Sequence, residues 1–306
     1  MYDVVVVGQA NVDYLARGPR LPGSGEGVNG DAFQEGCGGK GANQAVGAAR
    51  LGAAVALVAR VGDDARGAAV LSTLAAEGVD VRHVSRDRAS HTGVALCHVD
   101  AQGHKQILSA VGANARLDAA CVREASEALR AARVVLTQLG VPFDAFIEAV
   151  RLGRAAGARV VLDPAPGLPL RDEVLAQIEL IRPNALEAEA LTGIAVRDHE
   201  SAREAARQLV RRGARAAAVQ AGSEGDVLFW GEGECWLPRF EVPRVDVTGA
   251  GDAFASAIAV CLAEGRPMAE AGRFASASAA LATTALGAQA SLPRREAVLA
   301  LLARTG

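Results

Sequence analysis

Hydrophobic residues in this chain fall into short β-branched runs separated by longer Ala-rich segments. Residues 4–7 are four consecutive valines followed by Gly8, which is typical of a strand buried on both faces of a parallel sheet. Similar runs predict strands at 55–61, 133–137, 158–162 and 215–220, and helices at 40–51, 65–77, 117–131, 142–156, 184–192 and 201–212. This alternation predicts right-handed βαβ units and a mostly parallel sheet covered by helices.

Two stretches depart from the alternation. Residues 11–36 and 88–113 are rich in glycine and contain short alternating runs at 92–99 and 105–108, which favour antiparallel strands. Both stretches follow strands of the predicted main sheet, so they can meet over its carboxyl edge, where open α/β sheets bind ligands. They form either a lid over a ligand or two ordinary surface hairpins.

Three helical segments end the chain, at 251–264, 267–285 and 293–303. A length of 306 residues is long for one core and short for two. We therefore expect a single α/β domain over 1–306, with the stretches 11–36 and 88–113 as its small appendage.

Composition narrows the classes of function. Half of the residues are hydrophobic and 22% are charged, which predicts a well-buried sheet. The net charge of −3 offers no basic surface for nucleic acid. No apolar run approaches the roughly 20 residues of a membrane span, and no basic leader precedes the first strand. The five cysteines are scattered without a CxxC pair, which favours reduced thiols in a cytoplasmic protein over disulfides or a zinc site.

The segment DVTGAGDAF at 246–254 carries the clearest chemical signal. Gly249, Ala250 and Gly251 permit a tight turn that exposes backbone N–H groups at the start of a helix, whose dipole favours an anion there. Asp252 lies in the first turn of this helix, where a carboxylate can take the proton of an acceptor hydroxyl during phosphoryl transfer. The alternative is that Asp252 only caps the helix.

Two further segments suit a polyhydroxylated ligand. The glycine-rich stretch 36–43 precedes a helix, and its Lys40 and Asn43 supply hydrogen-bond donors. It is no Walker A loop, because Gly41 follows the lysine, and a plain strand-to-helix turn is its alternative. Asn11 and Asp13 follow the first strand two positions apart, so they point to one side and suit two neighbouring hydroxyls; an ordinary turn is the alternative.

The helix predicted at 184–192 opens with a polar pair. Asn184 and Glu187 have the spacing of a capping box. On spacing alone, this structural role is favoured over a role beside magnesium.

Together these segments resemble the ribokinases of the PfkB carbohydrate-kinase superfamily over nearly the whole chain. The matching segments are NVD at 11–13, GGKGANQAV at 38–46, TGVAL at 92–96, GAN at 112–114, DPAP at 163–166, PNALEAEALTG at 183–193, AGSEG at 221–225, DVTGAGDAF at 246–254 and GAQASLP at 287–293. The resemblance implies a Rossmann-like α/β fold with a small β-sheet lid that pairs two subunits as a homodimer. It also implies transfer of the ATP γ-phosphoryl group to a primary hydroxyl, with D-ribose as the first candidate.

The resemblance also implies roles for individual residues. Asp252 would be the base, and the anion hole would consist of Gly249, Ala250 and Gly251. The sugar would contact Asn11, Asp13, Gly39, Lys40, Asn43 and Asp252. The nucleotide would contact Asn184, Gln220, Gly222, Ser223, Gly225, Gly251 and Ser276. A hydrated Mg²⁺ would lie near Glu187, and an activating K⁺ would bind Asp246, Thr248, Ala285, Gly287 and Ser291.

Several positions depart from the ribokinase pattern. Gly140 stands where ribokinases usually carry a glutamate that helps to hold the sugar, and losing a carboxylate removes strong hydrogen bonds to a hydroxyl. Gln220 replaces a small hydroxyl residue, and Ser276 stands where His or Asn is frequent. Asp252 and the anion hole are unchanged, so the chemistry of a kinase is better supported than the identity of its sugar.

Three other functions compete with a ribokinase. A kinase of the same superfamily that acts on a nucleoside, fructose or keto-deoxygluconate stays an alternative acceptor assignment. A Rossmann oxidoreductase is not supported, because no GxGxxG follows the first strand. A non-catalytic sugar-binding relative would have no need of a carboxylate base beside an anion hole.

Overall fold

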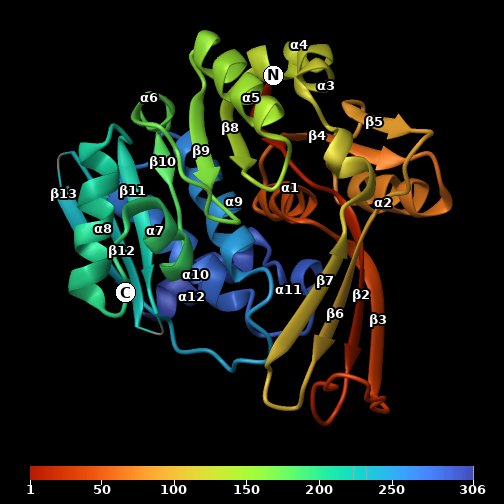
Figure 1. Cartoon of the computed structure of the whole chain (residues 1–306). Coiled ribbons are helices and arrows are strands. Elements are labelled where there is room, and N and C mark those ends of the chain that lie inside the picture. The colour runs from red at the N-terminus through yellow and green to blue at the C-terminus, as the bar shows by residue number, and fades with distance from the viewer. Residues whose placement is uncertain (223, 232, 306) are drawn as a thin grey trace.

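A nine-stranded sheet forms the body of the protein in the computed structural model, which describes residues 1–222, 224–231 and 233–305 (Figure 1). Its strands in spatial order are β13 (Gly233–Pro238), β12 (Gly225–Trp230), β11 (Ala216–Ala221), β10 (Leu180–Ile181), β9 (Arg159–Asp163), β8 (Ala132–Gln138), β1 (Tyr2–Val7), β4 (Val55–Gly62) and β5 (Val84–Asp87). Neighbours from β11 to β5 pair in parallel, and β12 and β13 add an antiparallel edge. The mostly parallel α/β prediction is therefore confirmed.

The four valines of β1 explain why this strand lies at the centre. All four are fully buried. Val4 and Val6 pack into the hydrophobic core on one face of the sheet, whereas Val5 and Val7 pack into the core on the other. Since side chains alternate along a strand, only a strand covered by helices on both faces can bury all four.

Helices supply these two covering layers. The face that contacts Val4 is covered by α1 (Lys40–Arg50), α2 (Ala65–Ala76), α9 (Ala250–Ala263), α10 (Met268–Leu281) and α12 (Arg295–Arg304). The short helix α11 (Ala288–Ser291) contacts α1 and β3 (Ala32–Gly38). The opposite face is covered by α3 (Ala119–Glu124), α4 (Ser126–Arg130), α5 (Phe143–Ala155), α6 (Asp172–Leu175), α7 (Ala185–Thr192) and α8 (His199–Arg211). Among the helices of the described residues, none has both the length and the apolar character that a bilayer crossing requires.

A second, four-stranded sheet extends away from this body (Figure 1). Its strands in order are β3 (Ala32–Gly38), β2 (Asn11–Arg17), β6 (Gly93–Val99) and β7 (Lys105–Ala110). The chain returns to the main body through the short helix η1 (Gly112–Arg116). The two glycine-rich stretches thus meet in one sheet, rather than forming two separate hairpins.

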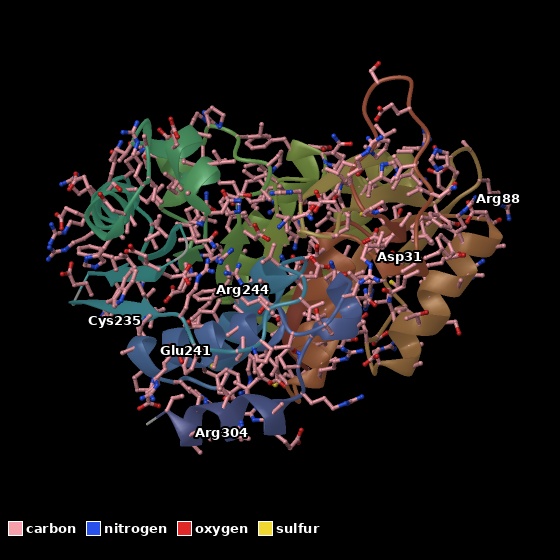
Figure 2. All side chains as sticks on the ribbon, turned by 90° about the horizontal axis from the view of Figure 1, so that it is seen from below. Asp31, Arg88, Cys235, Glu241, Arg244 and Arg304 are labelled. Atoms are coloured by element: carbon pink, nitrogen blue, oxygen red, sulfur yellow. The ribbon has the colours of Figure 1, made fainter. Side chains whose placement is uncertain are left out.

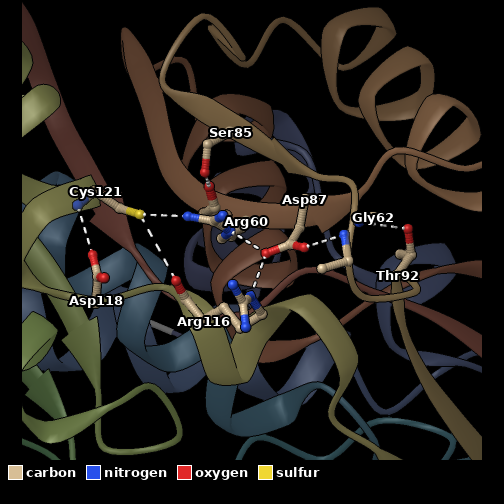
Figure 3. A network of polar contacts seen from close by, with 10 residues as sticks. Arg60, Gly62, Ser85, Asp87, Thr92, Arg116, Asp118 and Cys121 are labelled. Carbon is tan, nitrogen blue, oxygen red and sulfur yellow. Dashed lines mark hydrogen bonds and ion pairs between the residues drawn. The ribbon is translucent and has the colours of Figure 1, made fainter.

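A partly buried polar network ties η1 to the edge of the main sheet (Figure 3). Asp87, at the end of β5, accepts hydrogen bonds from Arg60 Nε of β4 at 2.8 Å and from Arg116 Nε of η1 at 2.7 Å. Burial disfavours the charged carboxylate, but the Ala89 N–H and the two guanidinium groups outweigh it and lower the pKa of Asp87 to about 2. The short helix that leads back from the small sheet is therefore held to the main body by charge.

Some elements differ from their prediction. The helix predicted at 117–131 is split into α3 and α4 at Ala125, whose φ of −87° and ψ of 12° leave the α-helical region, and both pieces pack on α5. The last long helix before residue 287 ends at Leu281 instead of 285, and residues 288–291, expected to be a turn, form α11.

Candidate active site

A cavity of about 450 Å³ opens at the carboxyl edge of the main sheet, where α9 begins. Its polar lining contains five basic side chains and four acidic ones: Lys40, Lys105, Arg182, Arg239 and Arg244, with Asp163, Glu187, Asp226 and Asp252. Arg244, labelled in Figure 2, belongs to the segment that connects β13 to α9. The basic side chains outnumber the acidic ones here, although the protein as a whole carries a net charge of −3, and this favours an anionic ligand.

The first turn of α9 is built to receive an anion. Gly249 is its N-cap with a φ of 87°, and no side chain caps the helix. The N–H of Ala250 reaches the carbonyl of Val247 at 3.3 Å. The N–H groups of Gly251 and Asp252 have no partner among the described residues. Unpaired N–H groups at the positive end of a helix dipole suit an anion, which is the role that the sequence predicts for this turn.

Asp252 does not cap its helix. This buried carboxylate instead accepts hydrogen bonds from two α1 side chains, Asn43 Nδ2 at 2.9 Å and Gln44 Nε2 at 3.0 Å. Lys40 Nζ lies 3.8 Å from Asp252 Oδ1. Burial raises the pKa of Asp252, while Lys40 and the two amides oppose the shift. A fixed carboxylate with a raised pKa suits general-base chemistry.

Asp163, at the end of β9, connects this carboxylate to the rest of the site. Its Oδ2 accepts from Lys40 Nζ at 2.9 Å and from Gln44 Nε2 at 2.8 Å. Gln44 in turn accepts from Gln138 at the end of β8. Burial opposes the charged form of Lys40, yet Asp163 and Asp252 raise the pKa of Lys40 overall, so its ammonium stays charged. Sequence reasoning assigned no role to Asp163, Gln44 or Gln138.

Hydrogen-bond acceptors without partners mark the part of the site beside the small sheet. Asn11 and Asp13 share one face of β2, and Asn11 Oδ1 accepts from Asn114 Nδ2 at 2.7 Å. Asp13 Oδ1 and Asn43 Oδ1 are buried and have no partner among the described residues. Burial, and next the charge of Asp252, raise the pKa of Asp13 to about 6. Buried acceptors of this kind call for donors from a ligand.

A second cavity of about 230 Å³ adjoins this region. It is lined by Asp13, by Leu15, Cys97 and Ile107 of the small sheet, and by α11. It therefore lies between the small sheet and the main body.

The opposite part of the large cavity contains most of the residues predicted for the nucleotide. Asn184 and Glu187 form the capping box of α7, and both also line the cavity with Gln220 and Ser276. Asn184 and Glu187 therefore cap the helix and also line the cavity. Gly222 and Gly225 lie outside the lining, and Ser223 lies outside the described residues.

Four of the five residues predicted for the monovalent cation are joined by hydrogen bonds. Asp246 Oδ1 accepts from the N–H and the hydroxyl of Thr248 at 2.9 and 2.7 Å, and its Oδ2 accepts from Gly287 N–H at 3.0 Å. Ser291 Oγ donates to the Gly287 carbonyl at 2.9 Å. Ala285 lies two residues before Gly287. Asp246 is buried, and the hydrogen bonds that it accepts among the described residues come only from neutral groups.

The space beside Gly140 is taken by a residue that sequence reasoning missed. Gln9 Nε2 donates to the Gly140 carbonyl at 2.7 Å. A Cβ at Gly140 would lie 3.1 Å from Gln9 Oε1. The glutamine thus occupies the space into which a side chain at position 140 would project.

Comparison with known proteins agrees with this geometry. The pattern that defines the pfkB family of carbohydrate kinases matches residues 1–295. The chain is 36% identical to the ribokinase of Haemophilus influenzae over 98% of both chains, and 35% identical to that of Bacillus subtilis over 99% of this chain and 100% of the relative. The structure of Arabidopsis thaliana ribokinase complexed with ribose and ATP superposes with a TM-score of 0.87, at 32% identity over 98% of both chains. The chain therefore belongs to the PfkB family of carbohydrate kinases.

Proposed function

We propose that this protein is a ribokinase, which transfers the γ-phosphoryl group of ATP to the primary hydroxyl of D-ribose and releases ribose 5-phosphate and ADP. The observation that carries the proposal is Asp252, a buried carboxylate one residue after the unpaired N–H of Gly251. A base beside an anion site is the arrangement that phosphoryl transfer to an alcohol requires. The ribokinases among its relatives support ribose as the acceptor.

In the proposed mechanism, the sugar hydroxyl attacks the γ-phosphorus while its proton passes to Asp252. The bond between that phosphorus and the bridging oxygen breaks, and ADP leaves with the electron pair. Hydrogen bonds from Asn43 and Gln44 keep the carboxylate aimed at the hydroxyl. Negative charge on the phosphoryl group is stabilised by the N–H groups of the anion hole, formed by Gly249, Ala250 and Gly251, and by the Lys40 ammonium. The small sheet closes as a lid and excludes water, which limits hydrolysis of ATP.

The sugar is held from the small sheet and from the start of α1. Asp13 Oδ1 is a buried acceptor, and the Nδ2 of Asn11 is a donor on the same face of β2. A donor and an acceptor two positions apart suit two neighbouring hydroxyls of a sugar. Gly39, Lys40 and Asn43 complete the sugar contacts in this proposal.

Two metal ions are part of the proposal. Mg²⁺ neutralises phosphate charge when it is bound with ATP. The described residues contain no preformed cluster of three or more acidic, His or Cys ligands, which suits a Mg²⁺ held mainly by phosphates and water beside the Glu187 carboxylate. K⁺ suits the loop of Asp246, because the donors there are oxygens and a buried carboxylate whose hydrogen-bond partners among the described residues are neutral favours a cation.

The nucleotide lies along the opposite part of the cavity. The residues assigned to it are Asn184, Gln220, Gly222, Ser223, Gly225, Gly251 and Ser276. We place the protein in the cytoplasm, a proposal supported by its five free cysteines.

The outer face of the small sheet supports a homodimer. Phe33, Leu96 and Leu108 are 68%, 40% and 70% exposed. The strand register puts these three side chains on one face of the sheet, opposite to the face that carries Asp13. An apolar sheet face of this kind is stabilised when a second copy covers it.

A second candidate acceptor is 2-deoxyribose. The deoxyribokinase of Salmonella typhi is 34% identical over 96% of both chains. Incubation with Mg·ATP and equal concentrations of the two sugars, followed by ³¹P NMR of the products, decides between them. We expect ribose 5-phosphate to dominate. Dominance of deoxyribose 5-phosphate would favour the second candidate, and ATP hydrolysis without a sugar phosphate would contradict both.

A further inference from the structure

Arg182 is a buried cation that the protein itself leaves without a hydrogen-bond acceptor. It follows β10, and its side chain is 9% exposed. Its Nε is buried without a partner, and no acceptor among the described residues lies within hydrogen-bond distance of its guanidinium. A guanidinium has five N–H donors, so leaving all of them unpaired is costly unless a ligand supplies acceptors.

The guanidinium is held in a fixed position. It lies over the ring of Phe254 in α9, 5.0 Å from the centroid, a distance at which a cation is attracted to an aromatic face. Its nearest carboxylate is Asp226 of β12, with a separation of 3.6 Å between Nη2 and Oδ1, which is an ion pair but not a hydrogen bond. The Asp226 Oδ1 is itself buried without a hydrogen-bond partner.

This position places the guanidinium against the anion hole. Arg182 lines the large cavity together with Gly249, Gly251 and Asp252. A Cβ built on Gly251 would lie 3.1 Å from Arg182 Nη1. The guanidinium therefore lies beside the first turn of α9, next to Gly251, whose N–H is unpaired among the described residues.

Three other cations of the cavity are engaged or exposed. Arg239 donates to the Gly222 carbonyl at 2.7 Å, and Arg244 is exposed to solvent. Lys40 is bound to Asp163. Arg182 is distinguished from these three by being buried, uncommitted and next to the anion hole.

We infer that Arg182 is a further catalytic residue, whose guanidinium donates hydrogen bonds to oxygens of the γ-phosphoryl group of ATP and stabilises its charge during transfer. The inference rests on the kinase function proposed above. The planar fork of an arginine matches two phosphate oxygens at once. Because Phe254 and Asp226 hold the fork before the nucleotide arrives, little reorganisation accompanies the reaction.

The test must separate this role from a structural one, because removing Arg182 alone leaves Asp226 buried without its ion pair. The double variant Arg182→Met, Asp226→Asn removes both charges and keeps side chains of similar size. Arg266→Met is the matched control, since Arg266 also lies 5.0 Å over a ring, that of Phe274, but does not line the cavity.

The binding of Mg·ATP and of adenosine is measured by calorimetry without a sugar, and kcat is then measured with the acceptor. For the double variant we expect parental adenosine affinity and melting temperature, an ATP affinity about tenfold weaker, and a kcat about 10²-fold lower. Parental ATP affinity and kcat in the double variant would overturn the inference. The Arg266→Met control should match the parent throughout.

If the double variant does not fold, Arg182→Lys decides the question, since it keeps a positive charge near Asp226 but loses the fork. We expect its kcat to fall at least about tenfold, and a parental kcat would overturn the role of the guanidinium.

Failure of the proposed function has a different signature, because the parent would then transfer phosphate to no sugar. The comparison of ATP with adenosine would still report on Arg182 in that case.

Discussion

The proposed sugar site contains two carboxylates, Asp13 and Asp252, whose charged forms are both disfavoured by burial. Asp13 has a pKa of about 6, raised first by burial and then by the charge of Asp252. Burial also raises the pKa of Asp252, which Lys40, Asn43 and Gln44 counteract. Asp13 lacks this support, because one of its oxygens has no partner among the described residues. A sugar hydroxyl that donates to Asp13 would supply the hydrogen bond that the protein itself does not provide.

We therefore predict that ribose binds more tightly as the pH rises through about 6. The ionised carboxylate accepts hydrogen bonds from two hydroxyl groups, whereas the protonated form is a weaker acceptor. The KM for ribose, measured from pH 5 to pH 8, should fall across this range. Asp13→Asn should raise KM and remove its dependence on pH near 6. An unchanged pH profile in that variant would refute the assignment.

Ionisation of Asp13 favours sugar binding but lowers the stability of the ligand-free protein. Its pKa in the folded protein lies above the ordinary value of 3.8, so its contribution to stability is greatest below pH 3.8 and is lost as the pH rises through about 6. Asp13→Asn should therefore raise the free energy of unfolding at pH 8 without ligand, by on the order of 2 kcal/mol. Urea unfolding at pH 5 and pH 8 measures the change, and a less stable variant at pH 8 would contradict the pKa.

At the scale of elements, Gly249 determines how α9 begins. Its φ of 87° is unfavourable for other residues, and a Cβ there would lie 3.0 Å from the backbone Cα of Ala288. Gly249→Ala should lower stability by more than about 1 kcal/mol and reduce kcat by displacing the anion hole. Gly265→Ala, beyond the other end of α9, is the control, because its φ of 74° is similar but its Cβ would contact nothing within 4 Å. Equal kcat in both variants would contradict the role of this turn.

The loop between α10 and α11 gives a second prediction at this scale. If K⁺ binds beside Asp246, initial rates in KCl should exceed those in NaCl at equal ionic strength, and Asp246→Asn should abolish the difference. The cation would orient the Gly287 segment, which Asp246 already binds at 3.0 Å. Equal parental rates in the two salts would exclude activation by K⁺.

The pattern of residues predicts those elements whose structure is decided locally. The valines of β1 and the glycines before α9 determine strand and turn by their own conformational preferences. The split of the helix at Ala125 depends on packing against α5, which the helical pattern of 117–131 does not contain. Strand β10 has only two residues, and the exposed edge strand β13 lacks a buried face with regular alternation, so neither has a recognisable pattern.

The residues of the site also divide into those that a local motif predicts and those that only the fold brings together. Asp252 and the anion hole form one continuous motif, and are predictable as such. Gln44, Asp163 and Arg182 come from α1, β9 and the end of β10, and meet only because parallel strands end at one edge. No short-range spacing connects them, so only the folded chain brings them together.

For the whole molecule, the small sheet has two faces with two proposed tasks. The face with Asp13 covers the sugar, while the face with Leu108 pairs with a second copy. We predict that the protein sediments as a dimer and that Leu108→Glu dissociates it, since a charge on a buried apolar interface is costly. Leu186→Glu is the control, because Leu186 is 78% exposed on α7 of the main body. A monomeric parent in analytical ultracentrifugation would contradict the dimer.

The central claim is that Asp252 is the base of a sugar kinase, and ADP release from Mg·ATP with D-ribose tests it most directly. The assay compares the parent with Asp252→Asn and with Asp144→Asn, an exposed carboxylate in the first turn of α5. We predict ribose-dependent ADP release by the parent and the Asp144 variant, and a loss of about 10²- to 10⁴-fold in Asp252→Asn with ATP binding retained. Near-parental turnover in Asp252→Asn, or a parent that releases no more ADP with ribose than without it, would contradict the account.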